Sequence, residues 1–172
     1  MAETTLIAIS DVQVYRQVSA SFPTARFDAF CMEIQRTNLR DLFGQALYLD
    51  FMADARTSGK YKDLLDGKDY VYANETIKYY GLKPMLVYWW LAIAARESDL
   101  FIANVGAIQL VNNTQQNLET AKEKDRIAVS YSQTAQSYAN DVIKFLNTEA
   151  STYTFWAAIT EKNKSNFLSF KL

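Results

Sequence analysis

The chain of 172 residues contains no histidine. This absence removes the side chain that most often serves as a general base, and with it the histidine-based triads and nearly all zinc sites. The five glycines form neither a G-x-G-x-x-G fingerprint nor a Walker-type loop, so the usual phosphate cradles are missing as well. We therefore expect no enzymatic activity, no cofactor and no bound metal.

Cysteine, excess charge and long apolar runs are also scarce. Cys31 is the single cysteine, so no disulfide can form within the chain. With 18 basic and 19 acidic residues the formal net charge is -1, which leaves no basic surface of the kind that neutralises phosphates. The longest apolar run, Met85 to Ala95, falls well short of the roughly 20 residues of a membrane-spanning helix. Because the N-terminal residues also lack the pattern of a secretion signal, we expect neither export nor membrane insertion.

The residues that are abundant predict one helical domain. Apolar residues make up 49% of the chain, enough for a single core. Ser10 to Val18 is expected to form a short amphipathic docking arm capped by Ser10, and Phe27 to Phe43 a helix with Thr24 as its cap. Ala46 to Ala55 continues the helical pattern after Gly44, so these last two helices are either separate or one kinked element.

The middle of the chain predicts a hairpin followed by a buried helix. Lys60 to Leu65 reads as a single helical turn, and the alternating pattern of Asp69 to Tyr80 predicts two strands around Ala73-Asn74-Glu75. Leu82 to Glu97 is apolar in nearly every direction, which is typical of a helix at the centre of a domain. Val105 to Val111 fits either a strand or a link to the next helix.

Asn117 to Leu146 predicts one long helix, because about thirty residues without proline or glycine would extend roughly 45 Å. Small residues recur every seven positions along it, among them Ala128 and Ala135, and such a seam allows another helix to approach closely. The remaining positions are polar. The helix is therefore expected to be an extended strut or an inter-subunit contact, with a long solvated helix as the alternative.

The fold class that these patterns predict is mainly α: a helical bundle with a long C-terminal helix and one small β-hairpin inserted between helices. Residues 1–150 are expected to form the domain, and residues 151–172 an aromatic tail that is an interaction segment, so that its removal abolishes assembly but leaves the helical fold intact. The candidate interface residues come from the hairpin, the seam and the tail: Tyr70, Tyr72, Tyr80, Ala128, Ala135, Tyr153, Phe155, Trp156, Phe167 and Phe170.

Three clusters offer weaker alternatives. Asp63, Asp66 and Asp69 gather acidic oxygens, but their spacing does not match a calcium-binding EF-hand loop, and turn acids explain them better. The pairs Glu33 with Asp41 and Asp50 with Asp54 are read as exposed helix-face charges rather than acid–base pairs. The run Tyr88-Trp89-Trp90 is read as core, with an aromatic ligand pocket as the alternative. A small-ligand-binding or regulatory helical bundle without catalysis is therefore the second functional hypothesis.

The central block resembles a known family. The segments FDAFCMEIQRTNLRDLFGQALYLDF and KYKDLLDGKDYVYANETIKYYGLKPMLVYWWLAIA, followed by Ala103, Asn104 and Gly106, are similar to the head-tail connector proteins of tailed bacteriophages, including crAss-like phages. The similarity covers roughly Phe27 to Glu149. The matching positions are turn and packing residues, and none is catalytic: Tyr61, Leu64, Leu65, Gly67, Tyr70, Gly81, Leu82, Lys83 and Pro84.

This resemblance implies a function in the virion. It implies a helical adaptor that binds beneath the portal protein as a ring, usually of twelve sister subunits, and presents a platform for the next neck or tail protein. The DNA would pass through the channel without sequence-specific binding, and no membrane would be involved. The protein would be made in the cytoplasm of the bacterial host and be located in the neck of the virion.

Overall fold

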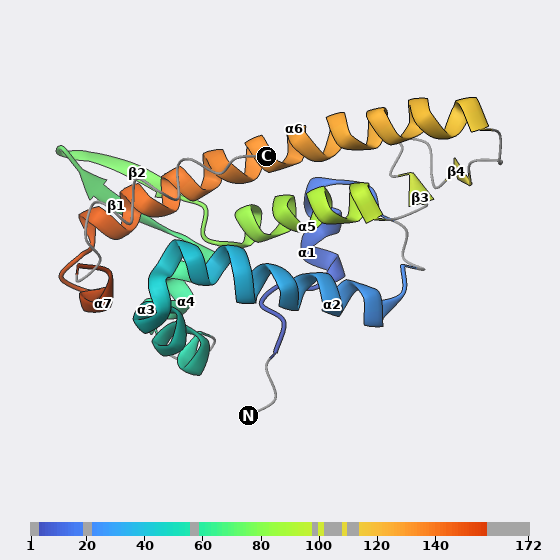
Figure 1. Ribbon diagram of the computed structural model, residues 1–172. Helices are drawn as coiled ribbons and strands as arrows, with labels where there is room; N and C mark the ends of the chain where they lie inside the picture. Colours follow the sequence, from blue (N-terminus) through green and yellow to red (C-terminus); the bar gives the residue numbers. More distant parts are fainter. Residues whose placement is uncertain are drawn as a thin grey trace.

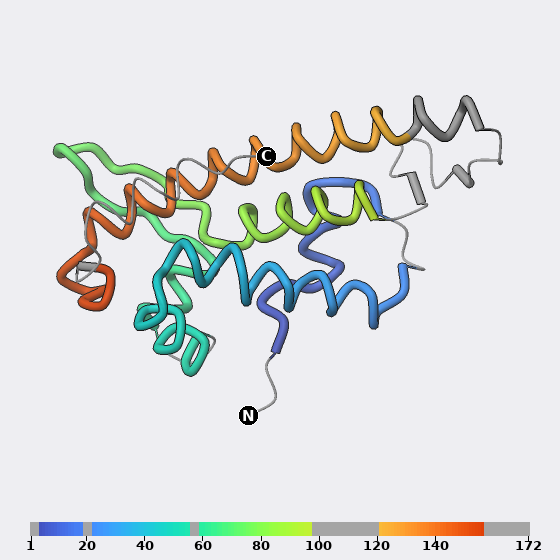
Figure 2. Tube along the Cα trace, in the orientation of Figure 1, coloured from blue at the N-terminus to red at the C-terminus, as the bar shows by residue number. Residues whose placement is uncertain are grey.

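The computed structural model describes residues 4–18, 22–55, 59–97, 100–101, 108–109 and 114–157, whose course can be followed in Figure 2. The elements are, in order, α1 (Ile9–Tyr15), α2 (Thr24–Ile34), the π-helix η1 (Gln35–Leu39), α3 (Arg40–Asp54), α4 (Gly59–Asp66), β1 (Lys68–Tyr72), β2 (Glu75–Tyr79), α5 (Lys83–Glu97), β3 (Leu100–Phe101), β4 (Ile108–Gln109), α6 (Thr114–Thr148) and α7 (Thr154–Ala157). The predicted class is confirmed: the fold is mainly α, with a long C-terminal helix and a hairpin between helices (Figure 1).

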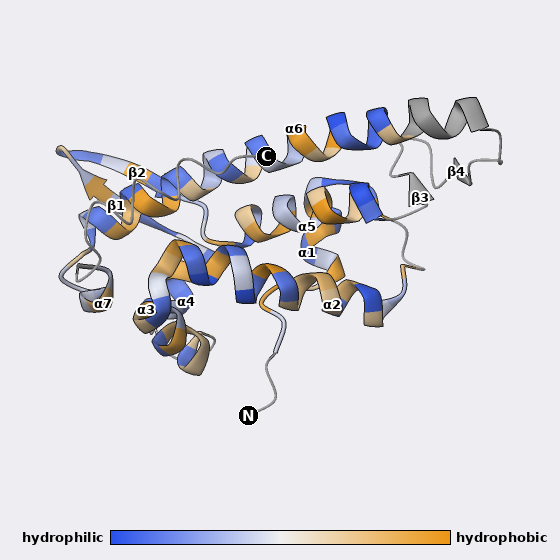
Figure 3. Cartoon of the chain, in the orientation of Figure 1, coloured by the Kyte–Doolittle hydropathy of each residue, from blue (hydrophilic) through white to orange (hydrophobic). Residues whose placement is uncertain are grey.

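Helix α5 is the centre of the core, as its all-round apolar sequence predicts. It contacts α6, α2 and α1, and in Figure 1 it lies between α6 and the α2–α3 pair. Val87, Trp90 and Leu91 are completely buried. In Figure 3 the hydrophobic colours gather on α5 and on the faces turned toward it, whereas the outer face of α6 is mostly hydrophilic. A helix of this composition needs cover on several sides, and the other helices supply it.

Helix α6 packs along α5 through its small-residue seam. Ala128, Ala135, Ala139 and Val142 are completely buried within the chain, and α5 is the helix that α6 contacts most extensively. Small side chains let two helix backbones approach closely, so the seam is used inside the subunit. The sequence left two interpretations of this helix open, a strut and a solvated helix. The structure gives a helix that is buried on one side and exposed on the other.

The hairpin has the predicted place and a tight turn. Strands β1 and β2 are antiparallel, with Tyr70 opposite Ile77 and Tyr72 opposite Glu75. The two turn residues, Ala73 and Asn74, have φ of 50° and 66°, as in a type I′ turn, whose twist matches that of the strands it joins.

The N-terminal arm is tied into the core of the same chain. The amide of Leu6 donates to Oε1 of Gln35, 2.7 Å away, and Leu6 is buried. Val12 of α1 is also completely buried. Ser10 is not the cap that the sequence suggested. The carboxylate of Asp11 accepts from the amide of Ala8 at 2.8 Å and stabilises the start of the helix.

Helices α2 and α4 differ in detail from the prediction, and α3 decides between two alternatives. Thr24 is the first residue of α2 rather than its cap, because the carbonyl of Pro23 accepts the amides of Arg26 and Phe27. Helix α3 bends at Gly44, whose φ of 70° and ψ of 161° are not helical, so the kinked alternative holds for this segment. Helix α4 has 8 residues rather than one turn.

The start of the predicted tail belongs to the helical body. Tyr153 and Trp156 are 1% and 2% exposed. The hydroxyl of Tyr153 donates to the carbonyl of Lys60 at 2.7 Å, and Nε1 of Trp156 donates to Oδ1 of Asn147 at 2.9 Å. Removing 151–172 would therefore remove core side chains, contrary to the prediction that the fold would stay intact. Phe167 and Phe170 lie outside the described residues.

Of the segment Val105 to Val111, the structure describes only Ile108 and Gln109, which pair as β4 with β3. Within the described part of the chain, no helix combines the length and the apolar character that crossing a bilayer requires.

Candidate interaction surface

The predicted interface residues divide into a buried group and an exposed group. Tyr72, Tyr80 and Phe155 are 57%, 56% and 45% exposed. The buried group fills the core of the subunit and is not available at its surface as the chain is folded: Tyr70, Ala128, Ala135, Tyr153 and Trp156. Aromatic content alone could not separate these groups, because large rings suit cores and interfaces equally.

The hairpin is fixed to the body through its inward face. The ring of Phe145 on α6 stacks on Tyr79 at a centroid distance of 4.1 Å and meets Tyr70 edge-on at 5.3 Å. The hydroxyl of Tyr79 donates to the carbonyl of Leu64 at 2.9 Å, and the ammonium of Lys68 lies 3.6 Å from the carboxylate of Glu149. These contacts hold the hairpin rigidly against α6.

The rest of the hairpin exposes apolar and aromatic side chains. We define the hairpin surface as Val71, Tyr72 and Tyr80, of which Val71 is 63% exposed. Side chains alternate across a strand, so Val71 and Tyr80 share the outward face, while Tyr72 lies on the inward face nearer the turn. The ammonium of Lys78 lies 5.4 Å from the ring centre of Tyr80. The sequence analysis singled out the two tyrosines but not Val71, which the alternation of the strands could have revealed.

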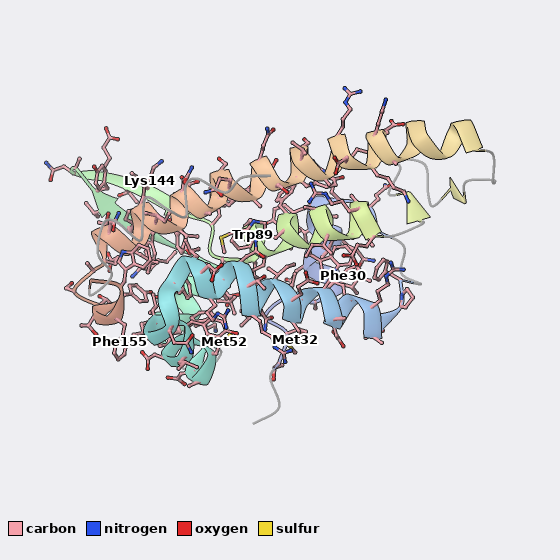
Figure 4. The ribbon with its side chains drawn as sticks, viewed as in Figure 1. Phe30, Met32, Met52, Trp89, Lys144 and Phe155 are labelled. Carbon is pink, nitrogen blue, oxygen red and sulfur yellow. The ribbon has the colours of Figure 1, made fainter. Side chains whose placement is uncertain are left out.

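The outer face of α6 is polar and, over residues 127–140, carries no charged residue. Ser130, Gln133 and Ser137 are exposed on it. Charged side chains occur on both sides of this stretch, from Lys122 to Arg126 and again at Asp141 and Lys144. In Figure 4, Lys144 and Phe155 lie toward the edges of the molecule, whereas Trp89 lies inside it.

Three of the acidic residues considered as chemical sites are engaged in structural contacts. Asp66 lies 2.8 Å from the ammonium of Lys83, Asp63 lies 3.8 Å from that of Lys68, and Asp50 accepts the hydroxyl of Tyr61. Within the described residues, no group of three or more acidic or cysteine side chains could hold a metal ion. Burial raises the pKa of Cys31 to about 12, with a further contribution from Asp28, so its reactive thiolate form is suppressed.

The aromatic run of α5 is packed by the chain itself. The ring of Trp90 lies 5.1 Å from those of Phe22 and Phe27, and its Nε1 donates to the carbonyl of Phe27. Tyr88 and Trp89 are each 7% exposed. A hollow of about 560 Å³ lies instead on the surface of α6, lined by Lys122, Asp125, Arg126, Val129, Ser130 and Gln133. Its described walls come from one helix.

The comparisons with known proteins give a family without a known activity. The model of a family of unknown function, DUF6712, matches residues 39–166, from the end of the π-helix through the hairpin, α5 and α6. No curated protein and no solved structure matches the chain. Since the match extends over most of the chain and all the elements that build the hairpin surface, the chain belongs to DUF6712, a family of unknown function.

Proposed function

We propose that this protein is a structural component of a tailed-bacteriophage neck: a head-tail connector that binds beneath the portal protein as a ring and docks the next neck or tail protein. The observation that carries the proposal is the hairpin surface. Three of the six large hydrophobic residues that are exposed in the described chain lie on this one hairpin. Exposed apolar and aromatic side chains grouped on a rigid element are typical of protein–protein contacts.

The anchoring of the hairpin supports an assembly role. A contact surface costs less to order on binding when its backbone is already fixed, and the stack of Tyr79 on Phe145 fixes this one. A ring of identical subunits, of which we expect twelve, uses heterologous contacts, in which one face of a subunit meets a different face of its neighbour. A projecting hairpin on one end of the molecule suits such a contact (Figure 1).

The charge of the chain supports the same proposal. The formal net charge is -1, and the middle of the exposed face of α6 is uncharged. A channel wall must let DNA slide, whereas a strongly basic surface would hold its phosphates. The resemblance of Phe27 to Glu149 to connector proteins adds a family precedent. The second hypothesis, a ligand-binding bundle, depended on the aromatic run of α5, in which Trp90 is packed against Phe22 and Phe27.

The hairpin surface provides the test. In the double variant V71S/Y72S we expect recovery of the tagged chain in portal complexes to fall at least about tenfold, because it removes exposed apolar side chains from both faces of the hairpin and a few such residues dominate the stability of an interface. The melting temperature should change little, since both side chains are exposed. Leu49→Ser is the matched control, because Leu49 is 57% exposed on α3, away from the hairpin.

Recovery is measured by pulling the tagged chain from the cells that naturally produce it and quantifying the portal protein that comes with it. Leu49→Ser should recover as much portal protein as the unmodified chain. If V71S/Y72S also does so, the hairpin surface is not the docking surface and the observation that carries the proposal is lost.

A further inference from the structure

Three tyrosines from two other helices gather around Tyr88 on α5. The ring of Tyr88 stacks with that of Tyr138 at a centroid distance of 5.8 Å and an interplanar angle of 18°. Tyr15 of α1 meets Tyr88 edge-on at 5.8 Å, and Tyr131 of α6 lies 6.1 Å away. Tyr15, Tyr131 and Tyr138 are only partly buried, so the cluster reaches the surface where α1 crosses α5 and α6. We call these four residues the tyrosine cluster.

A guanidinium group sits on this cluster. The Cζ atom of Arg16 lies 5.5 Å from the ring centre of Tyr88 and 5.8 Å from that of Tyr131. The local backbone explains the position. Helix α1 ends at Tyr15, and Arg16 is extended with φ of -149° and ψ of 147°. Nη1 of Arg16 donates to the carbonyl of Tyr15 at 2.8 Å, so the side chain folds back over the rings.

The rings are the principal partners of this cation. Two lysines that lie over rings also pair with carboxylates: Lys60 with Asp50 at 3.7 Å and Lys68 with Glu149 at 3.6 Å. In the part of the chain that the structure describes, no carboxylate lies within salt-bridge distance of Arg16. Aromatic faces attract cations, and a guanidinium is planar and weakly hydrated, so it stacks on rings with little loss of solvation.

We propose that the tyrosine cluster is a guanidinium-binding site, which Arg16 fills from within the same chain and which accepts an arginine side chain of a partner protein when Arg16 leaves it. Arg16 is exposed and stands at the end of a helix, so it can leave without disturbing buried side chains. The site then presents the faces of Tyr88 and Tyr131. This proposal stands independently of the connector function, because it depends only on the geometry of the cluster.

The test is a titration of the full-length Arg16→Ala variant with N-acetyl-arginine amide, which carries one guanidinium on a blocked backbone. We expect the ring resonances of Tyr88 and Tyr131 in NMR spectra to shift and to saturate in the roughly millimolar range, as suits one exposed cation–ring site. The unmodified chain should need at least about tenfold more probe, because the tethered Arg16 competes at high effective concentration. The double variant R16A/Y131A should lose the saturable shifts.

Two control probes identify the chemistry. N-acetyl-citrulline amide has the same shape without the charge and should leave the rings unshifted. Methylguanidinium carries the guanidinium without a peptide backbone, so tighter binding of the arginine amide than of methylguanidinium supports a polypeptide source, and the reverse would overturn it. Arg16→Gln repeats the titration with a longer neutral side chain if Arg16→Ala does not fold. The proposal is overturned if a folded variant gives no saturable shift with the arginine amide, or if the citrulline amide shifts the same rings equally.

Discussion

At the residue scale, two glycines fix the base of the hairpin. Gly67 and Gly81 have φ of 96° and 82°, where other residues are strained, and their backbones lie against each other. A Cβ atom added to Gly81 would meet the amide nitrogen of Gly67 at 2.7 Å and would clash with the carbonyl of Leu65. The amide of Leu82 donates to the carbonyls of Leu64 and Leu65. The end of α4 and the start of α5 are thus joined directly beneath the hairpin.

Substituting either glycine should therefore destabilise the fold. We expect Gly67→Ala and Gly81→Ala each to lower the free energy of unfolding by about 3 kcal/mol, from the left-handed backbone and the overlap of the added methyl group. Gly59→Ala is the matched control, since its added methyl group meets no atom within 4 Å. Urea denaturation of the three variants measures the effect. Equal stabilities for Gly81→Ala and Gly59→Ala would show that the two backbones do not meet as described.

The residue scale also shows where prediction from sequence stops. The glycines at 67 and 81 could be recognised as turn positions, but their contact joins residues on either side of the hairpin and has no local signal. Tyr72 and Tyr80 were predicted as interface residues in one set with Tyr70, which is buried, whereas the two others are exposed. Tyr70 alternates with Val71 in the same strand, and its burial depends on Phe145, some seventy residues away.

At the element scale, long or strongly periodic segments were predictable and contacts between segments were not. Helices α5 and α6 and the hairpin occur near the predicted boundaries, because periodicity and turn residues are local properties. The π-helix Gln35–Leu39 was missed. Its Gln35 accepts a hydrogen bond from the amide of Leu6, a contact with a segment distant in sequence. The sequence likewise did not decide whether the seam of α6 is buried against α5, since small residues fit a neighbouring subunit as well as the same chain.

Helix α7 gives the sharpest prediction at this scale, because two adjacent aromatic residues differ completely in burial. Trp156 is 2% exposed and hydrogen-bonded to Asn147, whereas Phe155 is 45% exposed. We expect Trp156→Ala to lower the free energy of unfolding by roughly 3–5 kcal/mol through the cavity it leaves. Phe155→Ala should cost less than about 1 kcal/mol, as exposed substitutions generally do.

Thermal and urea unfolding of the two variants distinguish the core role of α7 from a role in interaction alone. If Trp156→Ala is as stable as Phe155→Ala, the residues after 150 do not belong to the helical body. The prediction made from the sequence, that an interaction tail begins at residue 151, would then hold.

At the scale of the whole molecule, the chain builds a helical body with the β1–β2 hairpin at one end and a largely polar long helix along one side (Figures 1 and 3). Of the aromatic residues that sequence reasoning assigned to partners, the core uses Tyr70, Tyr153 and Trp156. Among the described residues, Tyr72 and Tyr80 on the hairpin and Phe155 on α7 remain exposed for partners. The fold could be predicted from the sequence. The site could be predicted only in part, because which rings are exposed is decided by packing between distant segments.

The connector ring is the central claim, and imaging what the tagged chain carries with it is its most direct test. The tagged chain is affinity-purified from the cells that naturally produce it, and the eluted particles are imaged by negative-stain electron microscopy. We expect rings, with portal complexes or whole phage necks among the particles. A small single particle, with neither rings nor portal protein, would contradict the account.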